Sequence, residues 1–244
     1  TKMDTEGADY DAVLKEAQEK GYAEKDPTAD VEGHDACRKV CILASLAFGK
    51  HVYPNQVETE GITKISLEDV SYIENAGGVI KLLGQIKYIN DNEIAAFVSP
   101  AVVYNGSQLA SVKDVFNAIL VRGDAVGDVC FYGPGAGKLP TASAVVADII
   151  DCAKHSDRKK IFGWGEGSEN YVVDYKEKIE MPFYVRAKAT PNEVNSKFAD
   201  VKFLSRKGQP SDEVAFITDY MTENKLNKKL DGMNVINTIK VTNY

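Results

Sequence analysis

A cluster of carboxylates and one lysine near the start of the chain has the residue types needed to bind and protonate a small polar substrate. Glu24 and Asp30 fall in a stretch that Pro27 and its turn-forming neighbours keep irregular. Asp35 and Lys39 are four residues apart in a predicted helix, so their side chains share one face. Fixed carboxylates can hold an ammonium group, and a lysine can donate a proton to a developing alkoxide. A surface ion pair without function gives the same spacing, so the pattern leaves both interpretations open.

A glycine-rich loop in the middle of the chain reads Gly133-Pro134-Gly135-Ala136-Gly137-Lys138. Glycines let a backbone approach a ligand closely, and the helix N-terminus that follows favours an anion. The loop is not a Walker A motif, because Tyr132 occupies the first glycine position and Leu139 follows the lysine. It does not fit the dinucleotide fingerprint either, since it follows an antiparallel strand late in the chain. A packing turn and a ligand-facing loop both remain open.

The chain of 244 residues carries 29 Lys and Arg against 36 Asp and Glu, which gives a net charge of −7. This acidic balance argues against a nucleic-acid partner or an anionic membrane surface, because both need a basic face. No apolar run approaches the roughly 18 residues of a membrane span. The cysteines lack zinc-site spacing, so no metal site is expected. All of them are interpreted as small buried side chains in a reducing cytoplasm, namely Cys37, Cys41, Cys130 and Cys152.

Several helices are predicted from apolar periodicity and capping residues. Helical spacing predicts helices over residues 9–20 and 33–48. A capping box beginning at Ser66 opens a third helix, which ends at Gly77-Gly78. A further helix is expected over residues 141–154, after the glycine loop.

The middle of the chain is predicted to form antiparallel sheet. Residues 79–89 and 93–104 predict two strands joined by a tight turn, the second interrupted at Pro100. Residues 116–121 and 128–132 predict another hairpin. We therefore expect an α+β fold, in which an antiparallel or mixed sheet is covered by helices on one face. Because these strands are apolar on both faces, the other face is expected to pair with a second copy in a homodimer.

The last third of the chain is predicted to form a small unit of its own. Residues 156–180 are polar and glycine-rich, which is typical of a linker. Beyond them the expected order is β-α-β-β-α-β, the ferredoxin-like pattern. The predicted division is a catalytic, substrate-binding and dimerisation unit over residues 1–155, the linker, and a ferredoxin-like domain over residues 181–244.

The chain resembles the homoserine dehydrogenases through a signature segment, Ala17-x-x-x-Gly21-Tyr22-Ala23-Glu24-Lys25-Asp26-Pro27-x-x-Asp30-Val31-x-Gly33-x-Asp35-x-x-x-Lys39. Further stretches are similar to the family: Glu60-Gly61-Ile62, Leu109-Ala110-Ser111-Val112, Gly123-Asp124-Ala125-Val126-Gly127 and Pro140-Thr141-Ala142-Ser143. The resemblance is strong over residues 1–155. The tail resembles, more weakly, the regulatory ACT domain of many family members, but Ala189-Thr190-Pro191-Asn192-Glu193-Val194 replaces the usual effector loop.

This resemblance implies an oxidoreductase that interconverts aspartate 4-semialdehyde and L-homoserine with NADP or NAD, in the biosynthesis of threonine, methionine and isoleucine. Lys39 would be the catalytic acid and base, and Asp35 would hold that lysine and orient the substrate. Homoserine would be bound by Glu24 and Asp30, with Tyr22 lining the pocket. The cofactor would be approached by Gly21 and by the loop glycines Gly133, Gly135 and Gly137.

Family members begin with a dinucleotide-binding domain that has no counterpart in these residues. The chain is therefore expected to be the C-terminal portion of such an enzyme, inactive alone, with the cofactor bound mainly by the missing domain. The degenerate ACT-like tail leaves threonine regulation open. The alternative is a non-catalytic, amino-acid-binding or regulatory module derived from the same fold.

Overall fold

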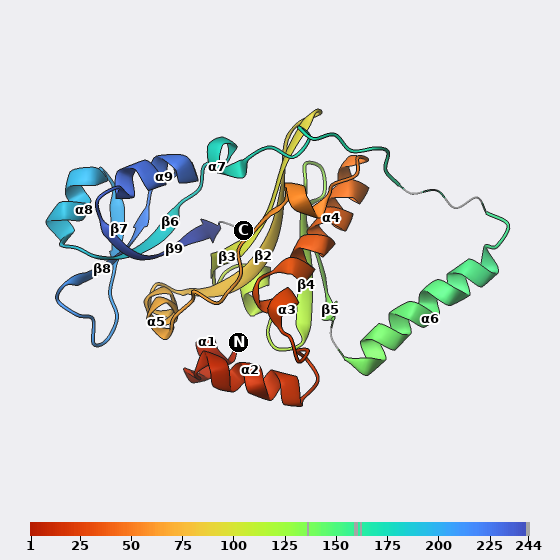
Figure 1. Ribbon diagram of the computed structural model, residues 1–244, viewed down its shortest axis with the longest axis horizontal. Helices are drawn as coiled ribbons and strands as arrows, with labels where there is room; N and C mark the ends of the chain where they lie inside the picture. Colours follow the sequence, from red (N-terminus) through yellow and green to blue (C-terminus); the bar gives the residue numbers. More distant parts are fainter. Residues whose placement is uncertain (136, 159–160, 162, 243–244) are drawn as a thin grey trace.

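The computed structural model describes residues 1–135, 137–158, 161 and 163–242. Its helices are α1 (Lys2–Glu6), α2 (Tyr10–Glu19), α3 (Thr28–Val31), α4 (His34–Phe48), α5 (Leu67–Asn75), α6 (Lys138–Lys154), α7 (Tyr175–Lys178), α8 (Pro191–Lys197) and α9 (Glu223–Leu230), with 3₁₀ turns at Pro54–Gln56 and Gln108–Ser111. Its strands are β1 (Glu58–Thr59), β2 (Gly78–Asn90), β3 (Glu93–Tyr104), β4 (Phe116–Gly123), β5 (Gly127–Pro134), β6 (Phe183–Lys188), β7 (Val201–Leu204), β8 (Glu213–Thr218) and β9 (Asn234–Thr242). The predicted α+β class is confirmed (Figure 1).

A seven-stranded sheet has the order β1-β3-β9-β6-β8-β7, with β2 paired to the other edge of β3. β2 and β3 form the predicted antiparallel hairpin. β3 is continuous from Glu93 to Tyr104, so the predicted interruption at Pro100 is wrong. On the edge of β3 away from β2, the last residue paired with β1 is Val98 and the first paired with β9 is Ala101. The missing N–H of Pro100 thus falls where a change of partner already interrupts the ladder.

Helix α4 covers one face of the β2–β3 hairpin, as predicted. Ala96 and Val98 of β3 pack in one cluster with Val40 of α4. The helix approaches β2 most closely at Gly84, where a Cβ would lie 2.2 Å from Val40 Cγ2. Glycine is therefore the residue that lets this helix and strand pack together. Helix α5 covers the same face further along, around Val102.

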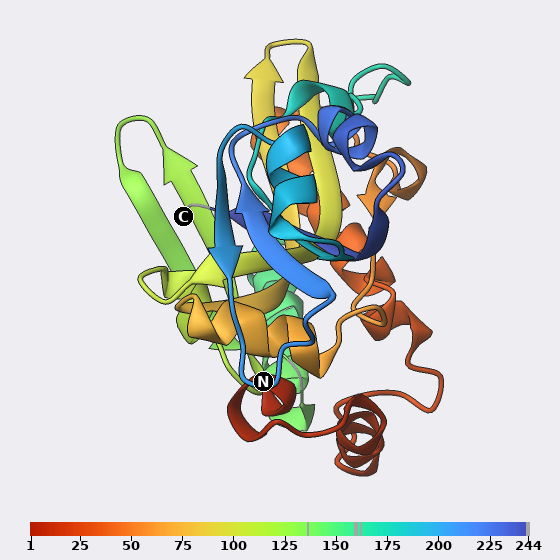
Figure 2. The same cartoon turned by 90° about the vertical axis from the view of Figure 1, so that its left-hand side faces the viewer.

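The opposite face of β3 is covered by the tail, so the prediction that a second copy covers this face is wrong for β3. Ala95 and Phe97 pack with Phe183 of β6, Val194 of α8 and Leu226 of α9. Figure 2 shows the tail helices in front of the β2–β3 hairpin. Because both faces are covered, every residue of β3 between its two ends is buried.

The tail has the predicted order β6-α8-β7-β8-α9-β9. Its strands are not a sheet of their own, because β9 pairs in parallel with β3, with Ala101 opposite Lys240. Pairing between strands so far apart in sequence leaves no local signal, which is why the sequence predicted a separate unit. The domain boundaries and the likeness of the tail to an ACT domain stay predictions.

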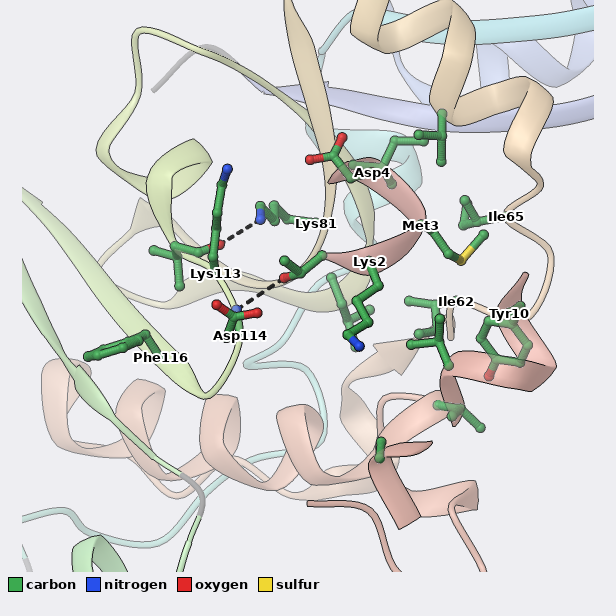
Figure 3. A pocket seen from close by; sticks show the side chains of 18 of the residues that line it. Lys2, Met3, Asp4, Tyr10, Ile62, Ile65, Lys81, Lys113, Asp114 and Phe116 are labelled. Atoms are coloured by element: carbon green, nitrogen blue, oxygen red, sulfur yellow. Dashed lines mark hydrogen bonds between the residues drawn. The ribbon is translucent and has the colours of Figure 1, made fainter. Parts of the chain in front are cut away.

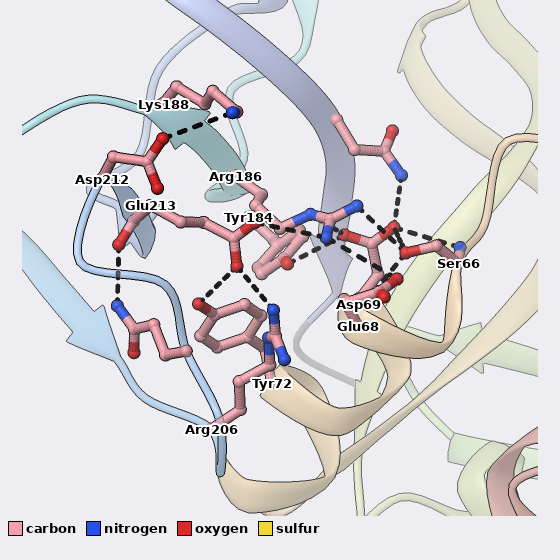
Figure 4. A network of polar contacts seen from close by, with 12 residues as sticks. Ser66, Glu68, Asp69, Tyr72, Tyr184, Arg186, Lys188, Arg206, Asp212 and Glu213 are labelled. Atoms are coloured by element: carbon pink, nitrogen blue, oxygen red, sulfur yellow. Dashed lines mark hydrogen bonds and ion pairs between the residues drawn. The ribbon is translucent and has the colours of Figure 1, made fainter.

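A buried network of polar side chains joins α5 to the tail strands (Figure 4). Asp69 of α5 lies 2.9 Å from Arg186 Nε of β6 and accepts a hydrogen bond from the Tyr184 hydroxyl at 3.0 Å. Glu213 of β8 accepts one from the Tyr72 hydroxyl at 2.9 Å and lies 3.6 Å from Arg186. Arg186 thus sits between two buried carboxylates contributed by different parts of the chain.

Part of the segment predicted as a linker is packed against the body. Tyr171 and Tyr175 are buried, and Val172 forms a bridge with Ile94. The linker prediction also includes residues 159, 160 and 162, which lie outside the described residues. The polar, glycine-rich composition predicted a linker, although Tyr171 and Tyr175 anchor this segment.

β4 and β5 form the predicted hairpin, but it is a two-stranded sheet of its own rather than part of the larger sheet, and α6 stands away from the rest of the chain (Figure 1). Helix α6 begins at Lys138, three residues before the predicted start, and has no buried residue. Cys37 and Cys41 are buried in α4 as predicted. The same prediction is wrong for Cys130 and Cys152, which are exposed because they lie on this hairpin and on α6.

Candidate functional site

The acidic turn, defined as residues 21–33, is built by backbone contacts at the end of α2. Gly21 adopts a φ of +72°, in the left-handed region that favours glycine. The next two amides, those of Tyr22 and Ala23, donate to the carbonyl of Ala17 at 2.9 and 3.2 Å. The side-chain amide of Gln18 donates to the backbone carbonyl of Glu24 at 3.0 Å. The turn is therefore fixed by α2 through its backbone, which leaves its side chains available.

The carboxylates of the acidic turn divide into those used by the fold and those that are not. Asp26 accepts from the amide and hydroxyl of Thr28 at 3.1 and 2.6 Å, and these hydrogen bonds lower its pKa. Glu32 accepts from the hydroxyl of Thr63 at 3.2 Å. Glu24 and Asp30 are exposed, and their carboxylates form no hydrogen bond or ion pair with any described residue. The fold does not use these two carboxylates, and their role in binding a substrate stays a prediction.

Asp35 and Lys39 share one face of α4, and this predicted juxtaposition is confirmed. Asp35 Oδ2 and Lys39 Nζ are 2.7 Å apart. The side chains are 45% and 64% exposed, so the pair faces solvent rather than the core. Gly33 immediately precedes α4 with a φ of +79°, and a Cβ there would lie 3.1 Å from Thr59 Cγ2 and 3.2 Å from Val98 Cγ1, so a larger residue would be strained. The start of the helix is thus fixed against the sheet while the charged pair stays accessible.

Tyr22 is half exposed, in keeping with a side chain that could line an open site. The roles assigned to Lys39, Asp35, Glu24, Asp30 and Tyr22 stay predictions, although the structure places all five residues on the acidic turn and the first turns of α4.

The glycine loop lies at the junction of β5 and α6. Gly133 has open space on its Cβ side, whereas a Cβ on Gly135 would lie 2.2 Å from the amide nitrogen of Asn117. Gly137 precedes α6 with a φ of +115°. Ala136 lies outside the described residues. No hydrogen bond or ion pair joins the described glycines of this loop to the acidic turn or to Lys39.

A cavity of about 470 Å³ is lined in part by residues of α1 and α2 (Figure 3). Its wall includes Ala17 and Val31 but none of the carboxylates predicted to bind substrate. Lys81 of β2 lies in it and donates to the carbonyl of Val112 at 2.6 Å, and burial lowers the pKa of this lysine. The cavity is therefore distinct from the predicted site.

Two further features lie next to the acidic turn, and the sequence predicted no function for either of them. A Cβ on Gly61 would lie 2.2 Å from the carbonyl oxygen of Val31, so the Glu60–Ile62 segment presses directly on the turn. Lys240 of β9 is buried and lies 3.6 Å from Glu60. The likeness of Glu60-Gly61-Ile62 to the family was the only sequence signal that pointed to this segment. No sequence signal pointed to Lys240, because its partner Glu60 is 180 residues away in the chain.

Among the described residues, no group of three or more His, Cys, Asp or Glu side chains is placed to hold a metal ion. None of the described helices has the length and apolar character that a membrane crossing requires.

The chain matches known proteins over most of its length. The family model described as homoserine dehydrogenase matches residues 1–150. The chain is 45% identical over 155 residues to homoserine dehydrogenase of Bacillus subtilis, and 48% identical over 154 residues to that of Synechocystis. These matches cover 64% and 62% of this chain but only 36% of each relative, so the match spans about a third of their length.

Solved structures extend the likeness to the tail. A crystal structure of homoserine dehydrogenase from Thiobacillus denitrificans is similar with a TM-score of 0.84 and 33% identity, over 99% of this chain and 60% of that one. The enzyme of S. aureus is similar with a TM-score of 0.79 and 31% identity, over 100% and 62%. The arrangement of the whole described chain therefore has counterparts in larger proteins.

Proposed function

The chain belongs to the homoserine dehydrogenase family, and from this premise we propose that it forms the substrate-binding and catalytic part of an oxidoreductase that interconverts aspartate 4-semialdehyde and L-homoserine. The observation that carries the proposal is the exposed Asp35–Lys39 pair, 2.7 Å apart, beside two carboxylates that the fold does not use. We place the reaction in amino-acid biosynthesis, on the branch to threonine, methionine and isoleucine.

In this reaction Lys39 donates a proton to the carbonyl oxygen of the semialdehyde, and it accepts that proton in the reverse direction. A proton donor in line with the carbonyl stabilises the alkoxide that develops there. Asp35 orients the lysine ammonium group through their ion pair. Glu24 and Asp30 hold the substrate ammonium group, since an amino-acid substrate carries a positive charge that two fixed carboxylates can bind. Tyr22 lines the same site.

The reduced cofactor, NADPH or NADH, would supply the hydride for reduction of the semialdehyde, and it would be bound mainly by residues outside this chain. The loop at the start of α6 is compatible with such a ligand, because Gly133 faces open space and the helix N-terminus favours a phosphate. Gly21, Gly133, Gly135 and Gly137 are the positions where this chain's backbone would approach the cofactor. Without the remaining cofactor site, we expect the chain alone to be inactive.

We further propose that the protein is a cytoplasmic homodimer. The exposed apolar side chains of the β4–β5 hairpin favour association, and four free cysteines suit a reducing compartment. Sedimentation equilibrium at micromolar concentration tests the dimer, and a monomer there would exclude it.

Calorimetric titration tests the substrate assignment on this chain. We expect weak homoserine binding that falls at least about fivefold in Glu24→Gln and in Asp30→Asn, because each loses one charge facing the ammonium group. Asp26→Asn is the matched control, since that carboxylate is used by Thr28 within the turn. Equal loss in all three variants would contradict the assignment. Tight homoserine or threonine binding with no response to NADPH would instead favour a regulatory module.

A further inference from the structure

The Glu60–Ile62 segment contacts the acidic turn at Val31 and Glu32. The amide of Ile62 donates to the carbonyl of Val31 at 2.8 Å. A Cβ on Gly61 would lie 2.2 Å from that same carbonyl oxygen and 2.5 Å from the Cα of Glu32. The contact is backbone against backbone, so neither partner can rotate away. Any side chain at position 61 must displace the turn.

The same segment is fixed to the sheet and to the start of α4. The amide of Glu60 donates to the carbonyl of Val98 in β3 at 2.8 Å. The Glu60 carbonyl oxygen lies 3.6 Å from where a Cβ of Gly33 would stand. The segment is thus a spacer between the central strand and the residues immediately before the Asp35–Lys39 pair.

The tail reaches this spacer through a buried lysine. Lys240 Nζ of β9 lies 3.6 Å from Glu60 Oε2 and 3.2 Å from Glu223 Oε2 of α9. The lysine side chain is only 6% exposed, and its ammonium group lies 5.2 Å from the centre of the Tyr175 ring. A charge removed from water in this way needs its carboxylate partners, so it restrains the Glu60 side chain.

We propose that Gly61 and the Lys240–Glu60 pair are positioning elements that set the affinity of the acidic turn for its amino-acid substrate. Through them the tail holds the turn carrying Glu24 and Asp30 in its binding geometry. Lys39 is affected less, because α4 is fixed independently by the contact of Val40 with Gly84. Loosening the spacer therefore changes substrate affinity more than proton transfer.

The test combines two readouts on Gly61→Ala, Lys240→Met and Glu60→Gln. Amide hydrogen exchange across residues 28–35 is measured on this chain, and steady-state kinetics with homoserine are measured in the complete enzyme that contains it. Gly61→Ala is expected to raise KM about tenfold and the two ion-pair variants about threefold or more, with kcat changed less than about threefold. Exchange across the turn is expected to accelerate in all three.

Two control variants match these changes elsewhere. Gly106→Ala adds a Cβ where nothing lies within 4 Å. Lys225→Met removes an exposed tail lysine that is paired with Glu180 at 2.9 Å. Both are expected to leave KM and turn exchange unchanged.

The proposal is overturned if KM stays within about twofold of the wild type in the three test variants, whether or not exchange accelerates. If Gly61→Ala does not fold, Lys240→Met and Glu60→Gln decide the outcome. The kinetic readout rests on the proposed function, but exchange does not. Wild-type protein that neither binds nor turns over homoserine would refute the proposed function, and unchanged exchange in the variants would still refute the positioning role separately.

Discussion

Asp69→Asn is expected to destabilise the fold strongly, because it leaves a buried arginine without its nearest countercharge. The Asp69 side chain is fully buried and the Arg186 side chain is 8% exposed, with 2.9 Å between Asp69 Oδ1 and Arg186 Nε. Asparagine keeps the shape and can still accept from Tyr184 through its oxygen, but its NH2 group then faces the Ser66 amide and the Asn237 side chain, which both donate to Asp69. The remaining countercharges are Glu213, at 3.6 Å from Arg186, and the more exposed Glu68, at 3.8 Å.

The magnitude follows from the burial of this pair. Removing one partner of a buried ion pair costs about 3–5 kcal/mol, whereas an exposed pair is worth about 0.2–1 kcal/mol. Since Glu213 stays, we expect about 3 kcal/mol for Asp69→Asn, a large part of a typical stability of about 5–15 kcal/mol. With a urea m-value of about 1–3 kcal/mol per molar, the unfolding midpoint should fall by about 1–3 M.

Urea unfolding followed by circular dichroism measures this change. Lys225→Met, which breaks an exposed pair, is the control and should shift the free energy of unfolding by less than about 1 kcal/mol. Arg186→Met combined with Asp69→Asn should cost less than the sum of the single changes by about 1–3 kcal/mol, because neither charge is then left alone. A loss for Asp69→Asn no larger than that of the control would refute the reasoning.

Three further outcomes follow from the packing. Burial, followed by a hydrogen bond to Glu213, raises the pKa of Tyr72 to about 12, so a spectrophotometric titration should show it ionising after the exposed tyrosines. Because this folded-state pKa lies above the ordinary value of 10.0, its contribution is complete below pH 10 and is lost as the pH rises toward 12. Gly84→Ala should lower the free energy of unfolding by about 1–3 kcal/mol in urea melts, whereas Gly106→Ala should change it little, and equal effects would contradict the close contact at Gly84. A thiol reagent should modify Cys130 and Cys152 rapidly in native protein and the two α4 thiols only on unfolding, so four fast thiols would contradict the burial of α4.

Most helices and strands of this fold could be predicted because capping residues and apolar periodicity lie within each element. The capping box at Ser66 forms with Asp69, and the helix over residues 33–48 and both hairpins are present where periodicity placed them. Asp35 and Lys39 meet because four residues make slightly more than one helical turn.

Long-range contacts were out of reach of the same patterns. The pairing of β9 with β3 joins strands more than a hundred residues apart, and it places Lys240 beside Glu60. The continuity of β3 through Pro100 depends on which strands flank it, and the exposure of Cys130 depends on whether anything covers its hairpin. The continuity of β3 and the exposure of Cys130 both depend on long-range contacts, which local sequence patterns do not indicate.

The central claim is that Lys39 transfers the proton at the reacting oxygen. The most direct test compares turnover and homoserine binding for Lys39→Met and wild type in the complete enzyme that contains this chain. We expect turnover to fall by at least about 10²–10⁴-fold while homoserine affinity stays within about threefold, since Glu24 and Asp30 still hold the ammonium group. Wild-type turnover in Lys39→Met would contradict the account.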